Sequence, residues 1–145
     1  MKYSTRLSDA VHLLLFIHLE PDADLSSAAI AASIHTNPAC VRQMMSRLRE
    51  AGLLRITQGR ARPSLARDIG EITLLDVYRA VEGRKPLLHL DTHTNPECGV
   101  GMCIQRTLQT YFDRIQARSE EEMGRISLRD IACSCCERLA GERGR

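Results

Sequence analysis

The sequence has no tryptophan, and it has no run of about 18 uncharged apolar residues that could cross a membrane. Its longest apolar stretch, Val11–Leu19, is interrupted by His12 and His18. No small-residue cleavage site follows the first six residues, so we expect no secretory signal and a cytoplasmic protein. The 145 residues are 43% hydrophobic, which suits about one domain with its own core and excludes wholesale disorder.

The usual sequence patterns of catalysis are also missing. There is no phosphate-cradling glycine loop, and no two carboxylates stand at a useful spacing. Cys98 and His93 are the pair that most resembles a nucleophile with its base, but nothing near them in the sequence supplies an oxyanion site or a substrate pocket. We therefore expect no enzymatic activity.

The net charge of the whole chain is only +2, but it is unevenly distributed. Between Val41 and Arg67 seven arginines stand against a single acid, Glu50, which gives this block a charge of +6 and leaves −4 for the rest. A local cationic block in a nearly neutral chain favours phosphate binding. The alternative is an arginine-rich face that is merely solvated.

The first half of the sequence has the order of elements of a winged helix-turn-helix domain. Residues 7–19 are apolar on nearly every face, which predicts a central buried helix. Asn37 and Pro38 form a typical start for the second helix of a helix-turn-helix, and Gly52 ends it. The expected elements are helices over residues 7–19, 26–33 and 38–51 and strands over residues 53–57 and 63–66. The fold class is therefore mainly α with a small β-hairpin.

The second half predicts a long helix that leaves this domain. Thr73 to Asp76 resembles a capping box, and Gly83 ends the helix that it starts. From Val100 onward, apolar residues recur at helical spacing over about 25 residues, more than so small a domain needs for its own core. We expect this stripe to pack against a second copy of the chain. Its members are Ile104, Leu108, Tyr111, Ile115, Met123 and Ile126.

A short last helix capped by Ser127, and a frayed tail from Gly141, complete the expectation. The chain then divides into a winged helix-turn-helix DNA-binding domain over residues 1–83, a loop with candidate sensor residues over 84–99, and the C-terminal dimerisation helix with the final short helix over 100–140.

A helix-turn-helix reads DNA with side chains near the start of its second helix. Arg42 and Gln43 are the best candidates for base contacts, because arginine can bond guanine and glutamine can bond adenine through two hydrogen bonds. Arg60 and Arg62 lie at the expected wing tip, and for Arg47 a pairing with Glu50 or water is an equal alternative. The expected DNA contacts are Lys2, Tyr3, Thr5, Arg6, Ser26, Ser27, Thr36, Asn37, Ala39, Cys40, Arg42, Gln43, Arg47, Arg60 and Arg62.

Six cysteines are the other unusual count, and in a cytoplasmic protein they default to free thiols, metal ligands or redox sensors. Cys98 directly precedes the long helix, and a thiol at a helix N-terminus is activated. Cys103 lies five residues later in the sequence. Oxidation of Cys40 would disturb DNA contact directly. These three residues are the candidate thiol sensors. The alternative for all six is that they are small buried hydrophobic residues without a function.

His89, His93, Cys98 and Cys103 supply two imidazoles and two thiols, which are the ligand types of a tetrahedral zinc site. Their spacing is not a recognised zinc-finger pattern. We expect no cofactor, and zinc at these four residues stays as an alternative.

Several segments resemble the Rrf2 family of bacterial winged-helix regulators. They are MKYSTRLSDAVHLLLFI, SSAAIAASIHTNPACVRQMMSRLREAGLL and GEITLLDVYRAVEG, while HTNPECGVGMCIQRTLQTYF resembles the family's YwnA-like subgroup. The resemblance implies a sequence-specific regulator, most simply a repressor. It also implies a homodimer, joined through the long helix, that binds a partly palindromic operator in double-stranded DNA.

The sequence departs from the family's pattern in two places. The family's wing carries a glycine-rich sequence of the type RGPGGGY, whereas QGRARPSLA here is stiffer and more cationic. Cluster-binding members have three closely spaced cysteines after the wing, whereas this chain has only Cys98 and Cys103 there. An iron–sulfur cluster ligated in that way is therefore not expected.

A second function stays open beside DNA binding. The winged domain could be a scaffold or interaction module in a protein that responds to a metal or a small molecule. The basic block discriminates between the two, because a pure interaction module has no need of seven arginines there.

Overall fold

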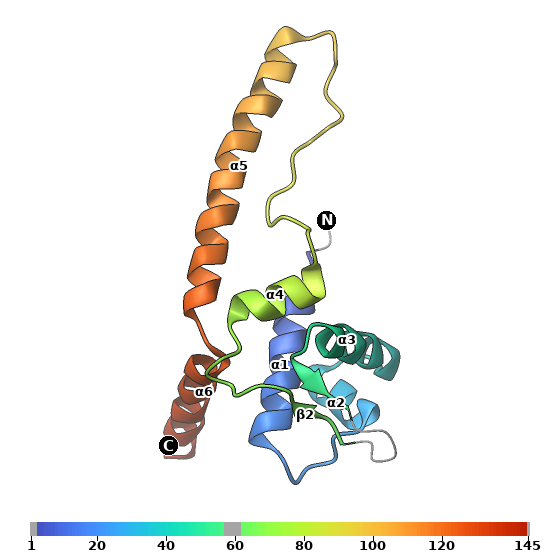
Figure 1. Cartoon of the computed structure of the whole chain (residues 1–145), viewed down its shortest axis with the longest axis vertical. Helices are drawn as coiled ribbons and strands as arrows, with labels where there is room; N and C mark the ends of the chain where they lie inside the picture. The colour runs from blue at the N-terminus through green and yellow to red at the C-terminus, as the bar shows by residue number, and fades with distance from the viewer. Residues whose placement is uncertain (1–2, 57–61, 145) are drawn as a thin grey trace.

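The computed structural model describes residues 3–56 and 62–144. In this part of the chain, six helices and one two-stranded sheet form a small domain from which a single helix projects (Figure 1). Lys2 and, at the expected wing tip, Arg60 lie outside the described residues, whereas Arg62 is described. The elements are α1 (Arg6–Leu19), α2 (Ser27–Ile34), α3 (Pro38–Glu50), β1 (Leu54–Arg55), β2 (Ser64–Leu65), α4 (Leu74–Glu82), α5 (Gly99–Arg125) and α6 (Leu128–Arg143).

The turn between α2 and α3 follows from three consecutive residue choices. His35 ends α2 in the left-handed region, at φ 67°, and its N–H donates to the Ala31 carbonyl. The Asn37 side chain then accepts a hydrogen bond from the Cys40 N–H, and Pro38 occupies the first turn of α3. An amide oxygen at the N-cap and a proline that lacks an N–H both suit a helix start. The predicted helix-turn-helix is therefore confirmed.

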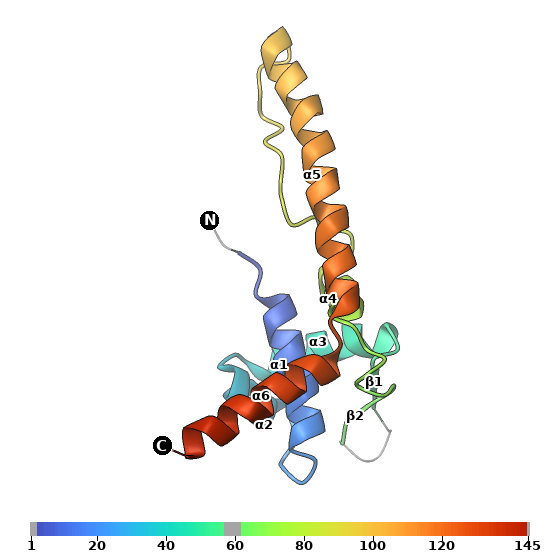
Figure 2. The same cartoon turned by 90° about the vertical axis from the view of Figure 1, so that its left-hand side faces the viewer.

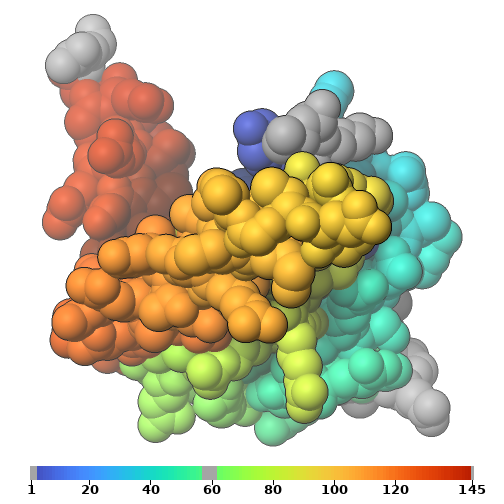
Figure 3. Space-filling view, turned by 90° about the horizontal axis from the view of Figure 1, so that it is seen from above, coloured from blue at the N-terminus to red at the C-terminus, as the bar shows by residue number. Residues whose placement is uncertain are grey.

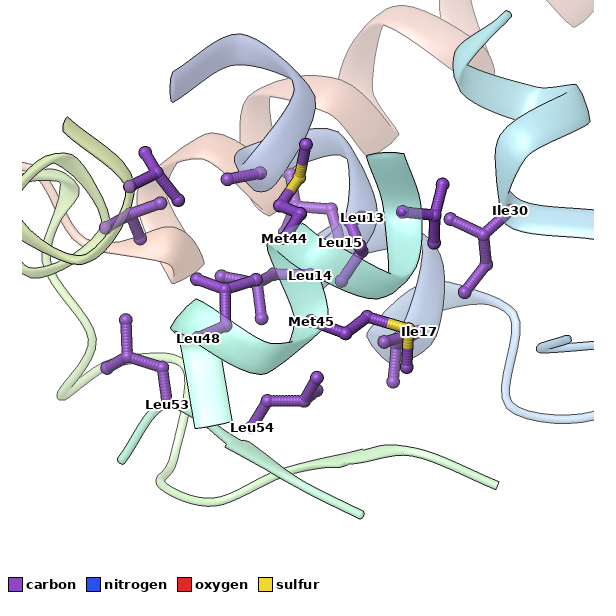
Figure 4. Packing of buried hydrophobic residues seen from close by; sticks show 14 of the residues in the cluster. Leu13, Leu14, Leu15, Ile17, Ile30, Met44, Met45, Leu48, Leu53 and Leu54 are labelled. Carbon is purple, nitrogen blue, oxygen red and sulfur yellow. The ribbon is translucent and has the colours of Figure 1, made fainter. Parts of the chain in front are cut away.

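The core of the domain lies between α1, α3, α4 and the hairpin. Leu13 and Leu14 of α1 and Leu48 of α3 are completely buried, and Figure 4 shows the side chains of α1 and α3 pointing toward each other. Leu53 and Leu54 extend the core to the hairpin. Burial of each such side chain stabilises the fold by about 1.5–3 kcal/mol.

The hairpin is shorter than its sequence pattern predicts. Leu54 pairs with Leu65 and Arg55 with Ser64 in antiparallel register, and these four residues are the whole described ladder. One further hydrogen bond, from the Ala66 N–H to the Leu53 carbonyl, extends the pairing toward α3. The strands expected over 53–57 and 63–66 are thus reduced to two residues each in the described part.

Capping boxes start both α4 and α6. The Thr73 and Ser127 hydroxyls accept the N–H groups of Asp76 and Asp130, whose carboxylates accept the N–H groups of Thr73 and Ser127 in return. The expectation at Thr73 is confirmed, whereas the expectation of a short last helix is wrong. α6 has 16 residues and continues to Arg143, through the tail expected to fray.

The α6 helix returns to the amino-terminal domain and completes its core. Leu128 is fully buried, Ala132 is 5% exposed, and both belong to the same cluster as the leucines of α1. Backbone hydrogen bonds from Leu128 to Ile72 and from Arg129 to Ile69 hold the start of α6 against the segment before α4. The domain is therefore built from both ends of the chain.

The α5 helix projects away from this domain, as Figures 1 and 2 show. Its 27 residues span about 40 Å at 1.5 Å per residue, and none of them is buried. Residues 84–98 run beside α5 to its distal end, and Figure 3 views both from that end, with α6 to one side. No helix in the described part of the chain is long and apolar enough to span a membrane.

Candidate nucleic-acid interface

The α3 helix has one buried face and one exposed face. Val41, Met44, Met45 and Leu48 are buried, as their spacing predicts. The other face leaves four of the expected reading residues exposed: Ala39, Cys40, Arg42 and Gln43. The buried face fixes the rotation of the helix, so the exposed side chains are presented in a defined direction. Such a surface fits the major groove, which is wide enough for an α-helix.

The start of α2 is fixed by a cap of two side chains. The Ser26 hydroxyl accepts the Ala29 N–H at 3.2 Å, and the Asp24 carboxylate accepts the Ser26 N–H at 2.9 Å. The hydrogen bonds from the Ser26 backbone and side chain lower the pKa of Asp24. The stabilisation that the Asp24 carboxylate adds to this cap is fully present above the ordinary carboxyl pKa and is lost as the pH falls through the lowered one. Ser26 is therefore the cap, and Ser27 is the first residue of the helix.

Arg47 joins α3 to α4. Its side chain is half-buried, and Nη1 donates a 2.9 Å hydrogen bond to the Val81 carbonyl in the last turn of α4. Helices leave their last carbonyls without partners, so this guanidinium caps α4. The sequence suggested Glu50 or a phosphate for Arg47 and did not identify this partner, which is 34 residues away along the chain.

The remaining expected contacts are distributed around α1 and the hairpin. Tyr3 is 83% exposed, and Thr5 and Arg6 are exposed at the start of α1. Arg62, at the end of the described wing, donates to the Ala23 carbonyl at 3.4 Å, which holds the wing near the turn before α2. Thr36 and Asn37 form the turn into α3, where Asn37 already serves as its N-cap. These basic and polar groups therefore come from the segment before α1, the turn before α3 and the wing.

The apolar stripe of α5 is exposed in its distal two thirds. Ile104 is 51% exposed, and Leu108, Tyr111 and Ile115 are also exposed, with Val100 in line with them at the same helical spacing. Met123 and Ile126 are half-buried, in contrast to the rest of the stripe, because this end of α5 lies against α4. Here the Ile126 carbonyl accepts the Leu74 N–H. The expected interface residues therefore fall into four that face outward and two at the junction with the domain.

The cysteine and histidine residues of the loop do not form one cluster. No three histidine, cysteine, aspartate or glutamate side chains in the described ranges converge as metal ligands, and His89, His93, Cys98 and Cys103 are all exposed. The Cys98 Sγ accepts the Gly101 N–H at 3.4 Å and so acts as the N-cap of α5. Cys40 on α3 is exposed, as are Cys133 and Cys136 on α6, and Cys135 is half-buried. The alternative of small buried hydrophobic residues therefore describes none of these four.

Comparisons with known proteins agree with this geometry. Residues 3–134 match the family model Rrf2, described as an iron-dependent transcriptional regulator. YwnA of Bacillus subtilis (strain 168), described as an HTH-type transcriptional regulator, is 39% identical over 128 residues, or 88% of this chain and 95% of YwnA.

Two solved structures extend the comparison to the fold. A protein described as DNA-binding is 37% identical, with a TM-score of 0.70 over 87% of this chain and 97% of its own. CymR of B. subtilis, described as its global cysteine regulator, has a TM-score of 0.65 over 92% of this chain and 98% of its own. At 20% identity CymR shows a shared fold alone.

The bond between Arg47 and Val81 predicts a stability defect that is separate from DNA binding. Arg47→Ala should lower the free energy of unfolding by about 1–3 kcal/mol, because it leaves a part-buried carbonyl without its charged donor. Urea unfolding at fixed protein concentration measures the change. Arg49→Ala, on an exposed residue of the same helix, is the control and should shift stability by less than about 0.5 kcal/mol. Equal stability of the two variants would contradict the capping role.

Proposed function

Because the chain belongs to the Rrf2 family of transcriptional regulators, we propose that it is a homodimeric repressor that reads a partly palindromic operator with α3. Like its family and its relatives, the protein is a DNA-binding transcriptional regulator and not an enzyme.

The single observation that carries DNA reading is the division of α3 into two faces. Its apolar side chains are buried in the core of the domain, where α2, α4 and β1 pack against the helix, while Arg42 and Gln43 are exposed in its first two turns. Arginine and glutamine are the side chains best suited to bidentate contacts with guanine and adenine. The arginines around this face supply the sequence-independent attraction for phosphates.

Dimerisation through α5 is supported by its unpartnered apolar stripe. Val100, Ile104, Leu108, Tyr111 and Ile115 follow one another at spacings of four, four, three and four and are all exposed. A contiguous stripe of this kind on a projecting helix is costly in water and is covered when two copies pack together. A two-fold axis through α5 would place one α3 on each side, as a palindromic operator requires.

Regulation by thiol oxidation is the third part of the proposal. Cys98 is exposed, and its Sγ lies at the N-terminal end of the helix that we propose joins the two copies. Oxidation would replace an acceptor of the Gly101 N–H by a bulkier group and would alter the start of α5. CymR is described as a cysteine regulator, and an oxidised form of Staphylococcus aureus CymR has been crystallised, which supports redox control in a protein of this fold.

Base reading by Arg42 is tested by selecting bound DNA from a random pool. The intact protein should enrich a site made of two inverted half-sites. Arg42→Ala should relax the preference at one guanine in each half-site, at a cost of about 1–3 kcal/mol. Arg138→Ala, on the exposed surface of α6, is the matched control and should enrich the same site as the intact protein.

The enriched site then tests repression, because the protein should lower transcription in vitro from a promoter that carries it. Absence of any enriched sequence would contradict DNA reading and would favour the alternative of a scaffold or interaction module.

The dimer is tested by placing a charge on the exposed stripe. Ile115→Glu should convert a dimer into a monomer, because a carboxylate within an apolar contact loses its water without gaining a partner. Analytical ultracentrifugation gives the mass directly. Gln109→Lys introduces a charge on another exposed face of α5, beside Asp113, and should leave the dimer intact. A monomeric intact protein, or a dimeric Ile115→Glu variant, would overturn the arrangement.

The sensor is tested with Cys98→Ser. Treatment with a thiol oxidant should change the DNA affinity of the intact protein, and the change should be absent in Cys98→Ser because serine keeps a capping oxygen without a redox-active sulfur. Fluorescence anisotropy on the selected site measures both. Cys133→Ser, on exposed α6, is the control that should respond like the intact protein. An unchanged oxidant response in Cys98→Ser would remove this residue from the mechanism.

A further inference from the structure

A cleft of about 540 Å³ lies where the end of α4, the start of the 84–98 segment and α5 meet. Its size falls within the range of small-molecule sites, which is about 300–1,000 Å³. Neither the DNA-reading face of α3 nor the exposed stripe of α5 contributes to it. The side chains that matter for its chemistry are Tyr78, Arg79, Arg84, Lys85, Gln116 and Glu120.

The walls of this cleft are held by a chain of three hydrogen bonds. The Tyr78 hydroxyl donates to the Lys85 carbonyl at 2.8 Å and accepts from the Gln116 amide at 3.1 Å. The Gln116 side-chain oxygen in turn accepts the Leu87 N–H at 2.9 Å. Gly83, at φ 63°, makes the turn that brings the segment back over Tyr78. The site is therefore formed before any ligand binds, which lowers the entropic cost of binding.

The charges in the cleft define the ligand that it fits. Arg79 Nε lies 4.0 Å from the Glu120 carboxylate, so these two charges largely offset each other. Over residues 3–56 and 62–144, no carboxylate comes within ion-pair distance of Arg84 or Lys85. Two cations without a partner thus stand on one wall, beside a phenol and an amide. An anion with two charges matches them, and arginine is well suited to carboxylate or phosphate.

The end of α4 connects this cleft to the two segments expected to touch DNA. Val81, one turn beyond Tyr78, accepts the Arg47 guanidinium of α3. Glu82 accepts a hydrogen bond from the Ser4 hydroxyl, in the segment before α1. Arg84 and Lys85 closely follow Val81 and Glu82 in the sequence. A ligand that draws these two cations into the cleft therefore also acts on the contacts of Val81 and Glu82. A change there alters how α3 and the first residues are held.

We propose that the cleft binds a small dianion, with two carboxylates or one phosphate monoester, and that its occupancy changes DNA affinity through Val81 and Glu82. The binding part stands on the cleft alone, whereas the regulatory part rests on the proposed function. The ligand is an effector that acts from outside the DNA-binding surface.

Calorimetric titration of the full chain with succinate and, separately, with glycerol 3-phosphate tests binding at constant ionic strength. At least one of them should bind saturably with one site per chain, and uncharged glycerol should not. Arg84→Glu and Lys85→Glu should each weaken that binding about tenfold or more, because each replaces an attraction by a repulsion. Arg138→Glu, an equal change of charge on exposed α6, should leave it unchanged. Circular dichroism confirms that the exposed variants are folded.

Anisotropy on the selected DNA site, with and without the dianion that binds, tests the regulation. The affinity of the intact protein should change at least threefold, and that of Lys85→Glu should not respond to the ligand. Saturable binding that is indifferent to Arg84→Glu and Lys85→Glu, or no binding of either dianion, overturns the site. Binding without any change in DNA affinity overturns the effector role. Because calorimetry uses no DNA, failure of the DNA-binding proposal is recognised separately.

Discussion

The burial of α1 is the constraint on which the rest of the structure depends. Leu13 and Leu14 of this helix are completely enclosed, and α2, β2, α4 and α6 all contact it. A helix that is apolar on most faces cannot be stabilised by a single neighbour, so elements from both halves of the chain are drawn to it. The α6 helix, which starts at Leu128, belongs to the domain for this reason, although it follows the projecting α5.

The projection of α5 is a consequence of that packing. α4 and α6 are both fixed on α1, and the Leu74 N–H bonds to the carbonyl of Ile126, between α5 and α6. The base of α5 is thereby attached to the domain, while its distal part has no domain surface to cover its apolar residues. Backbone hydrogen bonds along the whole of α5 make this helix stiff. Oxidation of Cys98, at its distal end, would therefore take place about 40 Å from the domain, at the far end of a stiff element.

Local sequence signals predicted the starts of the helices well. Asn37 with Pro38, Thr73 with Asp76, and Ser127 each mark a helix start through short-range hydrogen bonds, which depend on neighbouring residues only. The length of α6 was missed, because few of its residues are buried and their spacing gives little periodic signal.

The candidate reading face was predictable from the sequence for the same reason as the core, since the periodicity of α3 separates its buried side chains from Arg42 and Gln43. The partner of Arg47 was not predictable, because the Val81 carbonyl is offered by a backbone position that carries no side-chain signal. The cleft was not predictable either, because it is formed by residues that are far apart in the sequence. Tyr78 and Gln116 are 38 residues apart, and only the packing of α5 on α4 brings them together.

The segment over residues 84–98 is held to α5 by side-chain amides and not by a buried apolar face. Gln105 donates to the Asp91 carbonyl and to the Thr94 hydroxyl near the distal end, and Gln116 accepts from Leu87 near the base. Eleven residues make about three helical turns, so both glutamines face the segment from one side of the helix. Leu87 and Leu88 are exposed, so little apolar burial adds to these bonds. The segment has Cys98 at one end and the cleft lined by Arg84 and Lys85 at the other, so it connects the proposed sensor to the proposed ligand site.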